Sequence, residues 1–223
     1  MIDKKYITQS REPFFEIAKR LIAEDSKVLD VGPGIGAFSE YCERSDFFLL
    51  EGNSETVEFL RRKYENVFFG NIPRIPFESN FFDLIHCSHI VEHLNPQELY
   101  EFLIEMDRTL KIGGNIVIST PMLWENFYND LSHVKPYNPQ IFEKYLCGVD
   151  SNNLTRPAVS SSYKLTKLVF RYRDNFERFN LTNLKPNNIL NRFVNSIFWR
   201  LTKNGLVFLE KTGYTIVLRK NDL

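Results

Sequence analysis

The sequence predicts an α/β protein built on a mostly parallel sheet, with helices packed on both faces. Its first half alternates short apolar runs, typical of buried strands, with stretches in which apolar residues recur every three or four positions, typical of helices. That alternation is characteristic of parallel sheets with crossover helices. The run VLDVGPGIGAF places three glycines directly after the first predicted strand, where such sheets bind ligands. The chain has 223 residues, 43% of them hydrophobic, which is enough for one sizeable core, so we expect a single domain over residues 1–223.

The elements of the first half are placed by the spacing of their apolar residues. Helical stripes of apolar residues predict helices over residues 12–23, 37–44, 55–64 and 96–110. Apolar runs of strand length predict strands over residues 27–31, 47–50, 66–69, 82–87 and 115–120. Gly113 and Gly114 are expected to break the chain before the last of these strands.

The second half has a different pattern. Residues 121–139 are rich in aromatic residues, Asn and Pro, as expected of an active-site loop. A short helix is predicted over residues 140–146, and two late strands over residues 163–172 and 213–220. The residues between these strands, 173–212, are predicted to form a helical insertion.

The insertion carries one clear helix over residues 187–204, with its apolar residues on one side and Arg192, Arg200 and Lys203 off that side. Two interpretations remain open: a lid or homodimer contact whose apolar side is packed as core, or a helix that lies on a membrane surface. The formal net charge of the chain is zero, but residues 160–223 hold 12 Lys or Arg and 4 Asp or Glu, a local net charge of +8. That excess fits an anionic surface, and fits a solvated face equally well.

Composition narrows the class of protein. No apolar run approaches the roughly 20 residues that span a bilayer, and the first residues lack the apolar core of a signal peptide, so a cytoplasmic location is expected. Cys42, Cys87 and Cys147 are odd in number and lack metal-ligand spacing, which predicts reduced thiols and no metal site. The chain has no nucleic-acid recognition motif and no overall basic charge, so no nucleic-acid partner is expected.

The glycine turn carries an acid at its mouth. Gly32, Gly34 and Gly36 allow the backbone to come close to a ligand, but the pattern also fits some dinucleotide-binding turns. Asp30 helps to decide, because a carboxylate close to a pyrophosphate would cost on the order of 1–4 kcal/mol in Coulomb repulsion. S-adenosylmethionine has no phosphate and carries an ammonium and a sulfonium, so it suits Asp30 better than a dinucleotide does. A helix N-cap or a turn former is the structural alternative for this residue.

Several further segments resemble one family in order and spacing. VLDVGPGIGAFSEY, LLEGN, GNIPRIPFESNFFDLIHCSHIVEHL and LYEFLIEMDRTLKIGGNIVISTP are similar to successive motifs of the class I S-adenosylmethionine-dependent methyltransferases, and the resemblance covers roughly residues 14–146. It implies a Rossmann-like, seven-stranded sheet whose last strand is antiparallel, and it implies S-adenosylmethionine as the cofactor. The two late strands would then form the closing hairpin of the sheet.

The resemblance also assigns site residues. It implies that the methionine part of the cofactor is surrounded by Asp30, Gly32, Gly34 and Gly36, and that Glu51 holds the ribose, with Gly52 and Asn53 beside it. It places Asn71 and Ile72 at the adenine, and Ser88 and His89 at the methyl-transfer site. The family usually has Asp where this chain has Asn71, whose amide oxygen can still accept a hydrogen bond from the adenine amino group.

The acceptor side is predicted from the loop NDLSHVKPYNPQ. It resembles a loop of methyltransferases from sugar-modifying pathways, with matches at Asp130, His133, Lys135 and Tyr137. His133 is the candidate catalytic base, because the pKa of histidine suits proton removal near neutral pH, or else it only fixes the loop. His89 and His93 are alternatives, although His93 is expected to pack with the neighbouring helix.

The expected function is therefore methylation of a sugar or glycan hydroxyl. A methyltransferase acting on a natural product or a quinone remains open, as does a cofactor-binding homologue without turnover, whereas a dehydrogenase is the least favoured of the enzymes considered.

Overall fold

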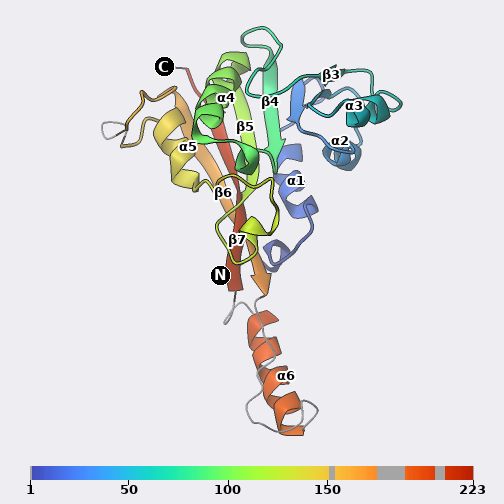
Figure 1. Ribbon diagram of the computed structural model, residues 1–223, viewed down its shortest axis with the longest axis vertical. Coiled ribbons are helices and arrows are strands. Elements are labelled where there is room, and N and C mark those ends of the chain that lie inside the picture. Colours follow the sequence, from blue (N-terminus) through green and yellow to red (C-terminus); the bar gives the residue numbers. More distant parts are fainter. Residues whose placement is uncertain (1, 151–153, 175–188, 204–208, 223) are drawn as a thin grey trace.

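The computed structural model describes residues 2–150, 154–174, 189–203 and 209–222, and it has three layers (Figure 1). The central layer is one seven-stranded sheet in the order β3-β2-β1-β4-β5-β7-β6. Strands β1 to β5 are parallel to one another, and β7 is antiparallel to both β5 and β6. The strands are β1 (Val28–Val31), β2 (Phe48–Glu51), β3 (Val67–Phe69), β4 (Phe82–Ser88), β5 (Leu110–Pro121), β6 (Tyr163–Asp174) and β7 (Leu209–Lys220). This arrangement confirms the predicted fold class.

Helices cover both faces of the sheet and bury two apolar clusters against it. One face packs α1, α2 and α3, whose buried side chains meet those of alternate strand positions such as Val28 and Leu84. The other face packs α4 and α5 against the intervening positions such as Leu29 and Ile85. The helical elements are η1 (Lys4–Tyr6), α1 (Glu12–Lys19), α2 (Ala37–Cys42), α3 (Ser54–Leu60), η2 (Val91–His93), α4 (Pro96–Thr109), η3 (Phe127–Asn129), α5 (Pro139–Leu146) and α6 (Ile189–Lys203).

The start of α4 is fixed by a capping box. The Asn95 side chain accepts hydrogen bonds from the backbone N–H groups of Gln97 and Glu98, at 2.9 and 3.0 Å. The Glu98 carboxylate in turn accepts from the Asn95 N–H at 2.8 Å, and Pro96 occupies the first helical position. Because η2 ends two residues before this cap, the same contacts hold η2 in place at the carboxyl end of β4.

The predicted break at Gly113 and Gly114 is wrong. Strand β5 runs through both glycines, but its register against β4 shifts, from Phe82 opposite Leu110 to Leu84 opposite Asn115. The extra residues bulge out of the ladder, and Gly113 adopts a φ of +82° there. The glycines therefore bend a continuous strand instead of ending it.

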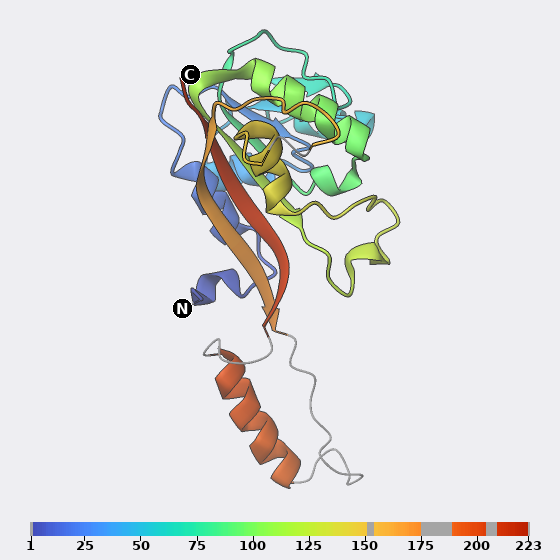
Figure 2. The same ribbon diagram turned by 90° about the vertical axis from the view of Figure 1, so that its left-hand side faces the viewer.

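The two late strands form a long antiparallel hairpin. Both are longer than predicted, and each extends into the segment that was predicted to be the insertion. Residues 173–174 and 209–212 of the predicted insertion belong to β6 and β7, and α6 spans Ile189–Lys203, while residues 175–188 and 204–208 lie outside the described part. Helix α6 projects beyond the hairpin, at the end of the molecule where the parallel strands have their carboxyl ends (Figures 1 and 2). Within the described segments, no helix is long and apolar enough to span a bilayer.

Candidate functional site

The glycine turn lies between β1 and α2, and its backbone requires glycine. Gly32, Gly34 and Gly36 have φ values of +64°, +55° and +85°, which side chains resist. A Cβ on Gly36 would also lie 2.9 Å from the buried Tyr64 ring, whereas one on Gly34 would meet no described atom within 4 Å. The middle of the turn therefore leaves open space above the backbone, as a ligand that approaches the main chain needs.

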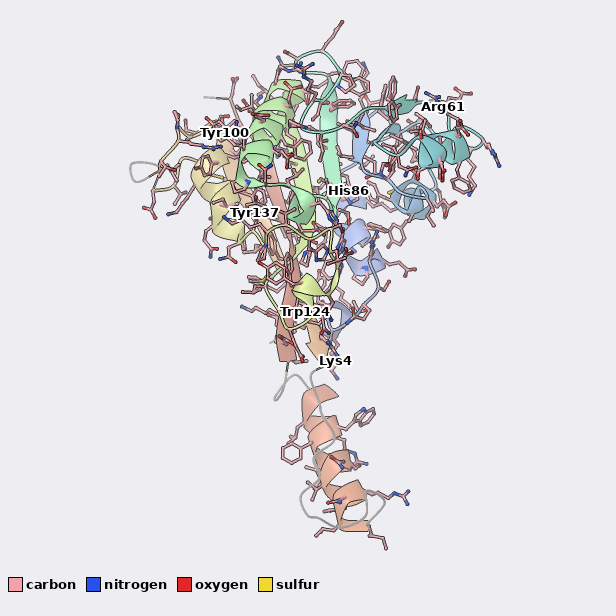
Figure 3. The ribbon with its side chains drawn as sticks, viewed as in Figure 1. Lys4, Arg61, His86, Tyr100, Trp124 and Tyr137 are labelled. Carbon is pink, nitrogen blue, oxygen red and sulfur yellow. The ribbon has the colours of Figure 1, made fainter. Side chains whose placement is uncertain are left out.

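Asp30 is buried at the end of β1, directly below this turn. Its Oδ1 lies 2.7 Å from Nδ1 of His86 on the neighbouring strand β4, and both side chains are almost fully buried. Figure 3 shows His86 beside α1; its ring stacks on Phe38 at 3.9 Å between centroids. The second oxygen, Oδ2, has no hydrogen-bond partner among the described residues. An orphaned buried carboxylate oxygen suits a cationic ligand group, so the site fits the ammonium of S-adenosylmethionine.

The residues predicted for the ribose and adenine gather at the ends of β2 and β3. Glu51 accepts a hydrogen bond from the Asn53 N–H at 2.9 Å, and a Cβ on Gly52 would lie 2.5 Å from Oδ1 of Asn71. Asn71 therefore lies directly against Gly52, with the partly buried Ile72 next in the chain. The side-chain oxygen of Asn53 instead caps α3 by accepting from the Thr56 N–H at 3.0 Å, so its side chain serves the helix.

Ser88 ends β4, and His89 follows it with a φ of +59° at the head of a buried polar network. The Arg171 guanidinium of β6 lies 3.2 Å from His89 Nε2, which must accept, so the ring hydrogen is assigned to Nδ1. That Nδ1 lies 3.1 Å from Oε1 of Glu92, an ion-pair distance without the angle of a hydrogen bond. The other oxygen of Glu92 accepts from the Thr120 hydroxyl at 3.0 Å.

Burial sets the protonation of this network. It lowers the pKa of His89 against the opposing effect of Glu92, and, together with Arg11, it lowers the pKa of Arg171 to about 10. Burial opposes ionisation of Glu92, but the His89 imidazole outweighs it, and the pKa of that carboxyl falls below its usual range. The network therefore presents a neutral His89 next to a fully buried carboxylate.

The loop after β5 folds back onto η2 and brings His133 to this carboxylate. The backbone N–H groups of Val134 and Lys135 both donate to the Glu92 carbonyl, at 2.9 and 3.1 Å. His133 Nδ1 lies 2.6 Å from the Phe127 carbonyl and therefore donates to it. The Nε2 of His133 is left with its lone pair, and Oδ2 of Asp130 lies 4.0 Å from it.

His93 lies beside His133, although the sequence predicted it only as an alternative to His133. Its Nδ1 lies 3.0 Å from the Ser132 carbonyl, and the two histidine rings are 5.1 Å apart. Its ring therefore contacts the loop after β5, a neighbour that the sequence did not predict. The sequence did not predict Glu92 as a site residue. The acid next to His93 in the sequence was the available signal of a polar site, but only folding brings the pair Glu92–His93 against His133.

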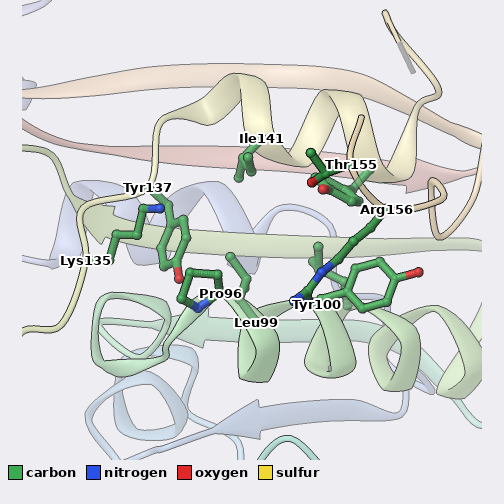
Figure 4. A pocket seen from close by; sticks show the side chains of 10 residues that line it. Pro96, Leu99, Tyr100, Lys135, Tyr137, Ile141, Thr155 and Arg156 are labelled. Atoms are coloured by element: carbon green, nitrogen blue, oxygen red, sulfur yellow. The ribbon is translucent and has the colours of Figure 1, made fainter. Parts of the chain in front are cut away.

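A cavity of about 270 Å³ lies beside the same loop, between α4 and α5 (Figure 4). Tyr100, Tyr137 and Tyr145 line it, together with the cationic side chains of Lys135 and Arg156. Arg156 lies over the Tyr100 ring at 5.3 Å. Aromatic faces with two cations can hold a polar ring that carries an anionic group.

Comparison with known proteins relates part of this chain to methyltransferases. A family model described as a methyltransferase domain matches residues 29–118, from β1 to β5. The chain is 30% identical over 125 residues to an uncharacterized protein of Methanocaldococcus jannaschii, covering 54% of each. It is 27% identical over 137 residues to a sarcosine/dimethylglycine N-methyltransferase of Aphanothece halophytica, covering 52% of this chain and 48% of that protein.

Among solved structures, the fold is similar to that of a SAM-dependent methyltransferase from Archaeoglobus fulgidus. The TM-score is 0.55 at 23% identity, over 94% of this chain and 97% of that one. The chain spans about half the length of the two curated relatives above. The matched segment holds all of the predicted cofactor residues, whereas His133 lies beyond it.

Proposed function

We propose that this protein transfers a methyl group from S-adenosylmethionine to a hydroxyl of a sugar or glycan. The proposal starts from the match of residues 29–118 to a family model described as a methyltransferase domain. When bound, S-adenosylmethionine supplies a methyl group on a positively charged sulfur. The chain then has to bind this donor at the glycine turn, place the acceptor oxygen in line with the methyl group and remove the hydroxyl proton.

A single observation carries the choice of a hydroxyl acceptor. His133 is held by the Phe127 carbonyl at 2.6 Å in a tautomer whose Nε2 lone pair is free to accept a proton. The hydroxyl proton would pass to this nitrogen, and the oxygen would form its new bond to the methyl carbon while the bond between that carbon and sulfur breaks, leaving S-adenosylhomocysteine. The neighbouring His93 and Asp130 make the same region polar.

The choice of a sugar rests on the cavity next to this loop. Its tyrosines and the cations Lys135 and Arg156 support binding of a polar ring with an anionic substituent, because aromatic faces and cations recognise these two parts. A purely apolar acceptor would gain nothing from the two charges. The resemblance of the loop itself to sugar-modifying methyltransferases points in the same direction.

The test is production of S-adenosylhomocysteine with three acceptor panels: acidic and neutral glycosides, quinols, and amines such as glycine and sarcosine. We expect turnover with glycosides. Turnover with amines or quinols alone would contradict the acceptor, and binding of S-adenosylhomocysteine without any turnover would favour the non-catalytic alternative.

A pair of variants tests the cavity. Tyr100→Ala should raise KM for the glycoside about fivefold, with little change in affinity for S-adenosylhomocysteine, since an aromatic contact contributes roughly 1 kcal/mol. Ile104→Ala is the matched control, because it lies on the same helix, is exposed and does not line the cavity. Equal KM values for the two variants would remove the cavity from the acceptor site.

A further inference from the structure

The polar cluster at the carboxyl edge of the sheet contains two histidines and one carboxylate from separate segments. Glu92 and His93 are adjacent in η2, and His133 comes from the loop after β5. One potential ligand atom from each of the three residues lies within 4.8 Å of the others. From this placement we propose that Glu92, His93 and His133 bind a divalent transition-metal cation such as Zn²⁺.

The distances are compatible with a metal centre after a small contraction. With metal–ligand distances near 2.0–2.2 Å, neighbouring ligands of a tetrahedral ion lie about 3.4 Å apart. Closing the cluster from 4.8 Å therefore requires movements of about an ångström, shared among the three side chains.

Both histidines are oriented as metal ligands usually are. The Nδ1 of His93 faces the Ser132 carbonyl at 3.0 Å, and the Nδ1 of His133 faces the Phe127 carbonyl at 2.6 Å. A ring N–H that donates to a backbone carbonyl fixes the tautomer and leaves the lone pair of Nε2 for the metal. The two rings lie side by side with centroids 5.1 Å apart, and one ring nitrogen of each lies within 4.8 Å of the other.

Glu92 supplies an independent reason to expect a cation. Its side chain is fully buried, and Oε1 makes no hydrogen bond with the described residues, although His89 Nδ1 lies 3.1 Å away. This oxygen therefore keeps its lone pairs, and a carboxylate oxygen is one of the ligands that Zn²⁺ takes in proteins. The carboxylate of Asp130, 4.0 Å from His133 Nε2, adds a second negative charge at the rim.

Three protein ligands leave at least one coordination position for another molecule, as in catalytic zinc sites and in the iron sites with two histidines and one carboxylate. A cation bound there would occupy His133, which the proposed function uses as the base, so the two roles of His133 exclude each other at any one moment. Binding of the cation does not rest on the proposed function.

The test is a titration of the metal-free 223-residue protein with Co²⁺, in which binding is measured by visible absorption and no methyl donor or acceptor is present. Zn²⁺ is then added as the competitor. We expect saturation at one Co²⁺ per chain and displacement by Zn²⁺. His133→Ala and His93→Ala should each weaken binding by at least the roughly 10- to 100-fold that loss of a second-shell partner causes. Glu125→Gln, an exposed residue of the same loop, should bind as the wild type does.

The outcomes separate this inference from the proposed function. Affinity for S-adenosylhomocysteine checks the fold of each variant, and if His133→Ala unfolds, His93→Ala decides. No saturable binding by the wild type, or wild-type affinity in a folded His93→Ala protein, would overturn the metal site. Glycoside methylation by a protein that binds no cation would overturn only this inference, and cation binding without glycoside methylation would overturn only the acceptor.

Discussion

At the scale of single residues, Asp30 has a double role. Its carboxylate holds His86 through one oxygen, and its other oxygen has no partner among the described residues. The sequence indicated an acid at the mouth of the glycine turn and explained it by a cationic ligand. The buried histidine partner was not foreseeable, because His86 lies on a different strand and is brought beside Asp30 by the pairing of β1 with β4.

Asp30→Asn tests this role. The amide keeps the size of the side chain but loses its charge, so affinity for S-adenosylhomocysteine should fall by about tenfold or more, as loss of a Coulomb attraction of roughly 1–4 kcal/mol implies. Calorimetric titration measures the affinity. His86→Asn serves as the comparison, because it disturbs the same pair without removing the charge. If the two variants lower stability and both leave affinity unchanged, Asp30 has only a structural role.

At the scale of elements, one ion pair ties the segment after the predicted adenine residues to α4. The Arg108 guanidinium binds both oxygens of Glu105, at 2.7 and 2.8 Å, and donates to the carbonyls of Ile75 and Phe77. The Ile75 N–H donates to Glu105 at 3.0 Å. These contacts attach the chain between β3 and β4 to a capped helix, so they help to place Asn71 and Ile72.

The pH dependence of stability should show this ion pair. The hydrogen bonds from Arg108 hold the pKa of Glu105 below its usual range, although partial burial opposes this. The unfolded chain therefore binds the proton more readily, and the contribution of Glu105 is present above a pH of about 4.5 and is lost as the pH falls through the folded-state pKa.

Glu105→Gln should accordingly lower the free energy of unfolding by about 1 kcal/mol at pH 6, a figure reduced for the partial exposure of the pair. The difference from the wild type should shrink at pH 3, where the wild-type carboxyl is protonated too. Urea titrations at both pH values measure it, with the exposed Glu78→Gln as the control. A difference that stays constant with pH would show that Glu105 acts through packing alone.

At the scale of the whole molecule, α6 stands apart from the two apolar clusters. It projects beyond the β6–β7 hairpin, and Ile189 and Phe193 are 82% and 64% exposed (Figure 2). The sequence predicted an amphipathic helix but left open whether its apolar side is packed as core or meets a membrane. Helix α6 lies at the end of the molecule that carries the candidate site. Both interpretations, a lid and a helix at a membrane surface, therefore stay predictions.

Substitution of α6 can separate stability from association. Replacing both Ile189 and Phe193 by Ser should change the free energy of unfolding by no more than about 0.5 kcal/mol, because exposed side chains contribute little to a core. Phe142→Ala, at a fully buried position of α5, should cost roughly 3–5 kcal/mol. Chemical denaturation measures both, and a large loss in the α6 variant would show that its apolar side is packed. Sedimentation and vesicle binding of the folded variant then test the dimer and membrane interpretations.

The sequence by itself determined the alternation of strands and helices, the glycine turn and the acids at the ends of β1 and β2. These features depend on apolar periodicity and on backbone conformations that only glycine adopts readily, and both are local. Tertiary structure alone decided that Gly113 bulges within β5, that Asp30 pairs with His86, and that Glu92, His93 and His133 meet. The reason is physical: strand register and loop packing bring together residues that are far apart in the chain, and no local pattern contains those contacts.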